Sequence, residues 1–262
     1  MNLCNKKIYF LISLVLVTGV AQVAERIQFY YFNPDSIKSN LRQLKSNMDS
    51  VLQKNNIPAA FQPFAKFSDF NDNIRTQRPS LLYVPYWYFE RYGKELKLRP
   101  LLTSLQDKKT NYQKKLITNI NSKKSIGHLD HSSLAMTTMG PDSKSMLNNI
   151  VFSDNSINTK KFSIIEVPKD IDAIFAVALG QVDSALVSSI NLQLLEKRNP
   201  RLTKSIRVIA NTKPMTLPIL CYLEGTLTEE KIKELRVQLK NTDNLEQSVA
   251  QVLGVDAWGP KL

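Results

Sequence analysis

The sequence predicts an α/β fold built from two units of the same type. Short apolar segments alternate with longer segments in which apolar residues recur every three or four positions, and this alternation runs from residue 26 to residue 253. The chain has 262 residues, of which 43% are hydrophobic and 22% are charged. This length suits one large domain or two small ones, and this composition argues against a disordered, collagen-like or multi-span membrane protein.

The amino terminus has the order of a secretory signal peptide. Lys6 and Lys7 precede the apolar run 8–17, and small residues follow up to Ala21 and Ala24. The run is shorter than the roughly 20 apolar residues that a membrane-spanning helix needs, so a retained signal anchor is the weaker interpretation. No cysteine follows the run directly, which argues against a lipoprotein. We therefore expect cleavage after Ala24 and a periplasmic location.

The first unit reads strand, helix, strand, helix, strand. Residues 26–31 are rich in β-formers, and Asn33 and Pro34 then suit an N-cap and a first helical position. One face of the helix that follows carries the apolar residues Leu41, Leu44, Met48 and Leu52. The remaining elements expected in this unit are a strand at 59–61, a helix at 67–76 and a strand at 80–84.

A second unit of alternating elements follows the polar, lysine-rich stretch 106–115. Strands are expected at 116–119, 125–128, 162–167, 184–187, 205–210 and 217–222. Helices are expected at about 132–148, at 170–179 and at 190–198. The chain ends in two helices, at 229–239 after the cap Thr228, and at 245–253.

The basic charge of the chain is spread over many segments. Lysine and arginine number 35 against 23 acidic residues, which gives a net charge of +12, and no run of five basic residues occurs. Nucleic-acid binding predicts basic residues clustered on one element with interleaved aromatics, so no nucleic-acid partner is expected. A solvated basic surface explains the excess, which favours an anionic small ligand or an acidic membrane surface only weakly.

Signatures of catalysis and of cofactor binding are missing from the sequence. It contains no G-x-S-x-G elbow, no G-x-x-x-x-G-K-[ST] loop and no G-x-G-x-x-G motif. His128 ends a strand-like run and His131 precedes a predicted helix, so loop histidines are favoured over a metal site that uses both. Cys221 lies in an apolar run, where a buried small residue is favoured over a nucleophile. We therefore expect no enzyme, no metal and no cofactor.

Three segments carry candidate ligand-binding residues. In the aromatic segment 83–89, Tyr86 falls at the carboxyl end of a predicted strand, where open α/β sheets bind ligands, although a place in the core is equally favoured. Ser132 and Ser133 start a predicted helix, whose N–H groups suit an oxyanion, and an ordinary helix cap is the alternative. Ser188 ends an apolar strand, either as a ligand residue or as part of a plain helix-turn-strand.

The stretch 171–195 brings these segments together in one resemblance. It resembles the helix, small-Gly-x-x-Asp, apolar strand and serine segment of periplasmic substrate-binding proteins of ABC transporters, in particular the phosphate, phosphite and phosphonate-binding family. Tyr86, the serine-rich start near Ser132 and the proline-spaced return segment 213–218 fall where that family would place them. The individual motifs are common, so the resemblance depends on their order along residues 26–260.

The chain also departs from this family pattern. The family's serine-rich turn usually reads Ser-Thr-Ser-Gly-Tyr, whereas residues 132–136 read Ser-Ser-Leu-Ala-Met. Asp130 lies beside this segment and would repel an anion. Ser188 stands where aminophosphonate binders carry an acid, so an aminoalkyl phosphonate is disfavoured. A plain or altered oxyanion, or no anion at all, stays open.

The resemblance implies a two-lobed type 2 periplasmic-binding (Venus-flytrap) fold with two chain crossings. The expected boundaries are a signal peptide at 1–24, lobe one at 25–108 and 207–262, and lobe two at 109–206. The implied function is capture of a small ligand, an oxyanion of the phosphate or phosphonate type, by a monomer that serves an ABC permease. The predicted ligand-binding residues are Tyr86, Ser132, Ser133 and Ser188. The alternative is an exported sensing or scaffold protein of the same fold that acts on a membrane sensor kinase or another protein partner.

Overall fold

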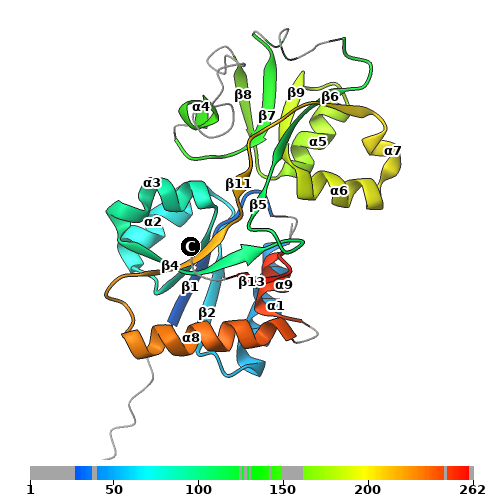
Figure 1. The fold of residues 1–262 in the computed structure, drawn as a ribbon. Helices are drawn as coiled ribbons and strands as arrows, with labels where there is room; N and C mark the ends of the chain where they lie inside the picture. The colour runs from blue at the N-terminus through cyan, green and yellow to red at the C-terminus, as the bar shows by residue number, and fades with distance from the viewer. Residues whose placement is uncertain are drawn as a thin grey trace, which may run out of the picture.

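The computed structural model describes residues 27–36, 40–123, 126, 129, 131–141, 143–148, 162–244 and 247–259. The predicted signal peptide and most of the strand predicted at 125–128 lie outside these residues. Within the described ranges, no helix is both long enough and apolar enough to cross a membrane. The chain forms two α/β units, each a sheet with its helices, joined by a thin link (Figure 1).

The first unit is built on a six-stranded mixed sheet. Its strands stand in the order β13 (Ala257–Gly259), β4 (Leu98–Leu105), β12 (Ile219–Leu223), β3 (Leu81–Val84), β1 (Ile27–Tyr31) and β2 (Ala59–Pro63). β1 pairs in parallel with β2 and β3. The other neighbours pair antiparallel, namely β3 with β12, β12 with β4, and β4 with β13. Because β12 and β13 come late in the chain, the chain returns to this unit after building the other.

Helices cover both faces of this sheet. α2 (Phe67–Gln77) and α3 (Tyr86–Leu96) pack on one face, and α1 (Leu41–Lys54), α8 (Glu229–Asn241) and α9 (Val249–Leu253) pack on the other. Alternate residues of β1 serve the two faces, since Tyr30 packs with α2 and α3 whereas Phe29 and Tyr31 pack with α1. The sheet is thus buried on both sides, and only its strand ends and edges are left for a site.

The second unit is built on a five-stranded sheet. Its strands stand in the order β10 (Ile206–Asn211), β6 (Lys114–Asn119), β9 (Ser184–Ser188), β7 (Ser133–Thr137) and β8 (Ser163–Val167). β9, β7 and β8 run parallel, and β6 and β10 add antiparallel pairs. α5 (Asp170–Ala178), α6 (Ser189–Arg198) and α7 (Pro200–Thr203) pack on one face, and α4 (Ser143–Met146) lies on the other.

Two short strands link the units. β5 (Asn111–Tyr112) and β11 (Met215–Thr216) pair antiparallel and lie between the two sheets (Figure 1). The chain therefore passes twice between the units, once in each direction. The second crossing, expected at residues 206–207, comes later in the chain, because β10 continues the five-stranded sheet as far as Asn211.

The prediction of a helix at about 132–148 is wrong. Residues 133–137 form β7, which pairs in parallel with β8 on one side and β9 on the other. Leu134, Ala135 and Met136 are consecutive and fully buried, which is the pattern of a central parallel strand rather than of one helix face. A helix follows only at α4, after the loop that leaves β7.

Two further expectations in the first unit are corrected. Asn33 and Pro34 lie in a loop and turn, and α1 is capped instead by Asn40, whose side chain accepts the Gln43 N–H at 3.1 Å. No helix or strand is predicted at residues 86–96 or 98–105, where the structure forms α3 and β4. Both are held by burial in the first unit, which local sequence pattern does not report.

Candidate functional site

The carboxyl ends of strands from both sheets meet between the two units. The turn after β1 supplies Asp35, α3 begins with Tyr86 after β3, β7 ends at Thr137, α5 begins with Asp170 after β8, and β9 ends at Ser188. Ligands of open α/β sheets bind at the carboxyl ends of the strands. This region is therefore the candidate site.

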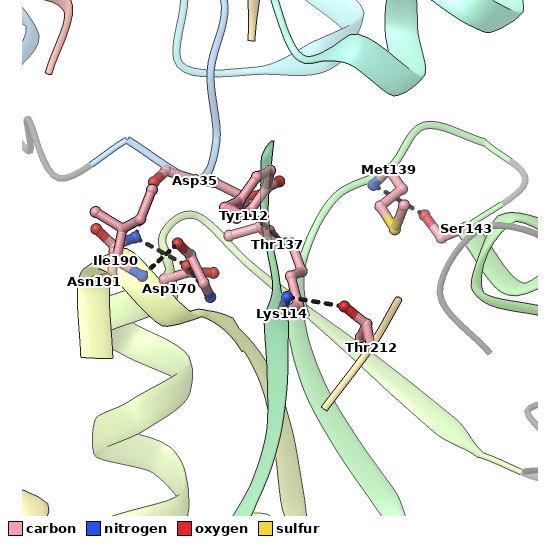
Figure 2. A network of polar contacts seen from close by, with 11 residues as sticks. Asp35, Tyr112, Lys114, Thr137, Met139, Ser143, Asp170, Ile190, Asn191 and Thr212 are labelled. Carbon is pink, nitrogen blue, oxygen red and sulfur yellow. Dashed lines mark hydrogen bonds and ion pairs between the residues drawn. The ribbon is translucent and has the colours of Figure 1, made fainter. Parts of the chain in front are cut away.

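Asp35 accepts hydrogen bonds from four residues in this region (Figure 2). Its Oδ1 accepts hydrogen bonds from Lys114 Nζ at 2.7 Å and Thr137 Oγ1 at 2.5 Å, and its Oδ2 accepts from the Tyr112 hydroxyl at 2.9 Å. Its backbone oxygen accepts from Asn191 Nδ2 at 2.8 Å. Asp35 belongs to the first unit, Tyr112 to the link, and the other partners to the second unit. One residue thus joins both units.

Asp35 and Lys114 form a buried ion pair that stays charged. Their side chains are 13% and 2% exposed. Burial raises the pKa of Asp35, but the charge of Lys114 and the hydrogen bonds outweigh it, so the pKa lies below its ordinary value. Burial lowers the pKa of Lys114, but the charges of Asp35 and Asp170 outweigh it, so this pKa lies above its ordinary value.

Asp170 is a second buried carboxyl group beside this pair. Its Oδ2 accepts from the Ser188 N–H at 2.7 Å and from Asn191 Nδ2 at 2.9 Å. Its Oδ1 is buried and has no hydrogen-bond partner among the described residues. Burial, and after it the negative charge of Asp35, raises the pKa of Asp170 to about 7. Asp170 therefore exchanges a proton near neutral pH.

Two small hollows share Tyr112 as a lining residue. The first, of about 30 Å³, has Asp35, Ser188 and Asn191 in its wall. A volume of this size admits one or two water molecules. The second, of about 130 Å³, is lined by Tyr86, Trp87, Glu90, Tyr112 and residues 214–216 of the link. Side chains thus fill most of the space between the strand ends.

Apolar side chains of the two units also pack against each other, beside the polar contacts. Trp87, Met139 and Met215 belong to one buried cluster that spans both units and the link. In the loop after β7, Gly140 has a φ of +88°, and a Cβ built on it lies 3.3 Å from the Trp87 ring. Both the backbone conformation and the close approach favour glycine at this position.

Tyr86 and Ser188 lie in the candidate site. Tyr86 lines the larger hollow and Ser188 the smaller one. The Ser188 hydroxyl also accepts the Ile190 N–H at 3.2 Å as the cap of α6. Their position at the strand ends agrees with the sequence argument, and their contact with a ligand stays a prediction.

Ser132 and Ser133 lie at the opposite end of β7 from Thr137, and no helix begins there. The Ser133 N–H and hydroxyl donate to Asp183 Oδ2 at 2.9 and 3.0 Å, and the Ser133 hydroxyl oxygen accepts the Asp183 N–H at 2.9 Å. Ser132 is buried. The oxyanion seat predicted at these two serines therefore loses the helix N-terminus on which it depended.

Sequence reasoning missed Asp35, Lys114 and Asp170. It assigns Lys114 to a polar stretch, Asp35 to the first turn of a helix, and Asp170 to an ordinary acidic helix start. One signal was present, since Lys114 is two residues before the apolar Leu116 and shares its face of a strand. A lysine on the buried face of a strand calls for a buried carboxylate.

Among the described residues, no group of three His, Cys, Asp or Glu side chains is placed to hold a metal ion. His128 and Asp130 lie outside those residues. Cys221 is buried in β12, as the sequence predicts, and its thiol donates to the Leu82 carbonyl at 3.4 Å. Burial raises the pKa of this thiol, which makes it a poor nucleophile.

Comparison with known proteins gives one family match and many matches of fold. The family described as "ABC transporter, phosphonate, periplasmic substrate-binding protein" matches residues 29–261. No curated protein matches the chain significantly. The family match spans both units and the link.

Solved structures share the fold at low sequence identity. A binding protein component of an ABC phosphonate transporter from Pseudomonas aeruginosa has a TM-score of 0.70 at 15% identity, over 88% of this chain and 80% of that one. PhnD1 from Prochlorococcus marinus, solved with methylphosphonate, has a TM-score of 0.70 at 14% identity, over 90% and 92%. A histidine kinase sensor domain similar to periplasmic binding proteins has a TM-score of 0.55 at 17% identity, over 89% and 98%.

Proposed function

Since the chain belongs to the family of periplasmic substrate-binding proteins of phosphonate ABC transporters, we propose that it captures a small phosphonate-type oxyanion between its two units. The role is binding and release of a solute, without chemistry on it. The ligand is handed to an ABC permease in the membrane, and the protein acts as a monomer. PhnD1 from Prochlorococcus marinus was solved with methylphosphonate, which is therefore the first ligand to test.

One observation carries this proposal, namely the convergence of three donors on one carboxylate. The ammonium of Lys114 and the hydroxyls of Thr137 and Tyr112 all reach the oxygens of Asp35. A carboxylate and a phosphonate monoanion each share one negative charge between two oxygens on one atom, so donors that fit the first suit the second. Hydrogen bonds in which the donor or the acceptor is charged are stronger than bonds between two neutral groups.

We propose further that the two units are the lobes of a hinged pair. The predicted lobes, residues 25–108 with 207–262 and residues 109–206, need one change: β10 (Ile206–Asn211) belongs to the second sheet, so lobe two extends to Asn211. β5 and β11 are the hinge. Two antiparallel strands of two residues each are a narrow connection, which supports rigid-body bending. In this arrangement, Tyr86 of lobe one and Ser188 of lobe two face the ligand from opposite sides.

Export to the periplasm is part of the proposal. It is supported by the family match and by the order of Lys6, Lys7 and the apolar run 8–17. Intact-mass measurement on periplasmic protein should show the loss of the first 21 or 24 residues. The full-length mass in a membrane fraction would instead support a retained anchor.

The binding test compares two threonines of the second unit. Thr137→Val removes one donor from the candidate site, so its affinity for methylphosphonate should fall by about 10- to 100-fold in calorimetric titration. Thr118→Val is the matched control, because Thr118 is equally buried but donates to the Asp183 carbonyl at 2.8 Å. It should lower stability and leave affinity unchanged.

Two results would contradict the proposal. If the wild type binds none of methylphosphonate, phosphate, phosphite and sulfate at millimolar concentration, the ligand class is wrong. If Thr137→Val and Thr118→Val bind equally well, the ligand site lies elsewhere.

A ligand-sensing role that acts on a membrane sensor kinase is the second candidate. The fold similarity to a histidine kinase sensor domain favours including it. A strain that lacks the chain separates the two roles. Loss of methylphosphonate uptake supports transport, whereas unchanged uptake with a lost transcriptional response supports sensing.

A further inference from the structure

The donors of the candidate site are already used by the protein itself. Lys114 Nζ and Thr137 Oγ1 bond Asp35 Oδ1, and the Tyr112 hydroxyl bonds Oδ2. The hollow beside Asp35 is about 30 Å³, which is room for one or two water molecules. A phosphonate group therefore cannot reach these donors while the Asp35 carboxylate stays where it is.

Asp35 belongs to the first unit, whereas Lys114 and Thr137 belong to the second. It lies in the turn after β1, whereas Lys114 starts β6 and Thr137 ends β7. Asn191 of α6 adds a contact to the Asp35 backbone oxygen at 2.8 Å. The carboxylate thus fills the anion position of the second unit with a side chain from the first.

We propose that Asp35 is an internal anion that occupies the oxyanion donors of the site, joins the two units without ligand, and must be displaced when an external oxyanion binds. This inference rests on the proposed function, because it takes the same donors as the ligand site. Binding is then an exchange of one negatively charged group for another at Lys114. No bond is made or broken in the exchange.

The exchange explains how Lys114 is kept charged in the absence of ligand. Its side chain is 2% exposed, and a buried ammonium without a countercharge is strongly disfavoured. Asp35 supplies the countercharge until a ligand takes over. Asp35 is therefore a specificity-determining residue, because only an anion that competes with a tethered carboxylate enters the site.

Electrostatic repulsion extends the same argument to ligand charge. After displacement, the Asp35 carboxylate stays attached to the turn beside the site, and Asp170 is a second acid close to Lys114. Like charges at short range in a buried site repel. The arrangement therefore favours a ligand with one negative charge over a ligand of similar shape with two.

The test compares substitutions at two neighbouring acids, each of which removes one carboxyl group. Asp35→Ala frees the three donors, so the variant should bind methylphosphonate about 10- to 100-fold more tightly than the wild type in calorimetric titration. Asp170→Asn is the matched control, because Asp170 bonds Ser188 and Asn191 and none of the three donors. Its gain in affinity should be clearly smaller. Asp35→Asn, a near-isosteric change, replaces Asp35→Ala if melting curves show that the alanine variant does not fold.

The outcomes separate this inference from the proposed function. Equal gains in the Asp35 and Asp170 variants, or an Asp35 variant that binds no better than a binding-competent wild type, would overturn the internal-anion role and leave the proposed function standing. Failure of every variant and of the wild type to bind would remove both.

A measurement on the wild type does not depend on any variant folding. The ¹³C signal of the Asp35 carboxyl carbon should move when methylphosphonate is added, because the carboxylate loses its contact with Lys114. An unchanged signal at saturating methylphosphonate would overturn the exchange.

Discussion

Lys114→Met is the substitution with the largest expected effect on stability. Lysine and methionine are both long and unbranched, so the change mainly removes the ammonium group. Nζ of Lys114 bonds Asp35 at 2.7 Å and Thr137 at 3.1 Å, and the side chain is 2% exposed. Its removal leaves Asp35 buried without a countercharge and with Asp170 nearby as a second acid.

The magnitude follows from the burial of the pair. Removing one partner of a buried ion pair costs about 3–5 kcal/mol, because the remaining charge is desolvated and uncompensated. In a chain of this size, 1 kcal/mol lowers the melting temperature by roughly 2–4 °C. The melting temperature of Lys114→Met should therefore fall by about 6–20 °C. The double variant Asp35→Asn/Lys114→Met should lose less than Lys114→Met alone, since no unpaired charge of this pair remains.

The contribution of Asp35 to the pH dependence of stability should change sign at the same time. In the wild type the folded pKa of Asp35 lies below its unfolded value of about 3.9, so the pair contributes stability above that pH and loses it as pH falls through the folded pKa. In Lys114→Met, burial is no longer opposed and the folded pKa of Asp35 rises above the unfolded value. The variant should then gain stability as pH is lowered toward about 4.

Urea denaturation at pH 8 measures the loss of stability, and comparison with pH 5 measures the pH effect, since Lys114→Met should gain more stability on acidification than the wild type gains from Asp170. Lys231→Met is the matched control, because Lys231 pairs with Glu234 at the surface, where the side chains are 29% and 48% exposed. Surface pairs contribute about 0–1 kcal/mol, so this control should stay close to the wild type. A loss in Lys114→Met no larger than the loss in Lys231→Met would refute the reasoning.

Three further predictions follow from the same contacts. Burial raises the pKa of Asp170 to about 7, so the folded state keeps a proton that the unfolded chain releases above about 3.9. Wild-type stability should therefore fall as pH rises from about 4 to about 7. Denaturation curves of Asp170→Asn should lack this fall. Ser133→Ala removes the two hydrogen bonds between the Ser133 hydroxyl and Asp183 and should lower stability by about 1–2 kcal/mol without changing methylphosphonate affinity, whereas a tenfold loss of affinity would support the predicted serine seat. Asp35→Ala removes a contact between the units and should show a larger radius of gyration than ligand-free wild type in small-angle scattering, whereas equal radii would show that other contacts hold the units.

The fold class was predictable from sequence because it depends on the alternation of apolar strands and amphipathic helices. Residues 184–188 show this well, since an apolar run between Asp183 and Ser189 gives a central strand with its serine at the carboxyl end. Residues 133–137 show the limit. An apolar run of this length fits a buried strand or a buried helix segment equally, and only the neighbours β8 and β9 decide between them.

The candidate site was less predictable because its members are defined by partners far away in the chain. Lys114 and Lys115 are adjacent and alike in sequence, yet of the two only Lys114 is buried, because its ammonium faces Asp35 and Thr137. Asp35 and Thr137 are 102 positions apart. Local pattern carries no information on such a contact, whereas the position of Tyr86 and Ser188 at strand ends was predictable because strand ends are local features.

The Asp35–Lys114 pair is difficult to explain by stability alone. Replacing a buried ion pair with apolar residues of similar volume is often neutral or stabilising, so a fold that needed only rigidity would be served as well by two apolar side chains. Apolar side chains, however, offer nothing that an incoming anion can replace. Asp35 lies on a turn of one unit and accepts from Lys114 and Thr137 on strands of the other. Its carboxylate keeps both donors oriented and Lys114 charged, and it can still be displaced. The property that distinguishes the pair from an apolar contact is exchange, which is the property that a ligand site between two units requires.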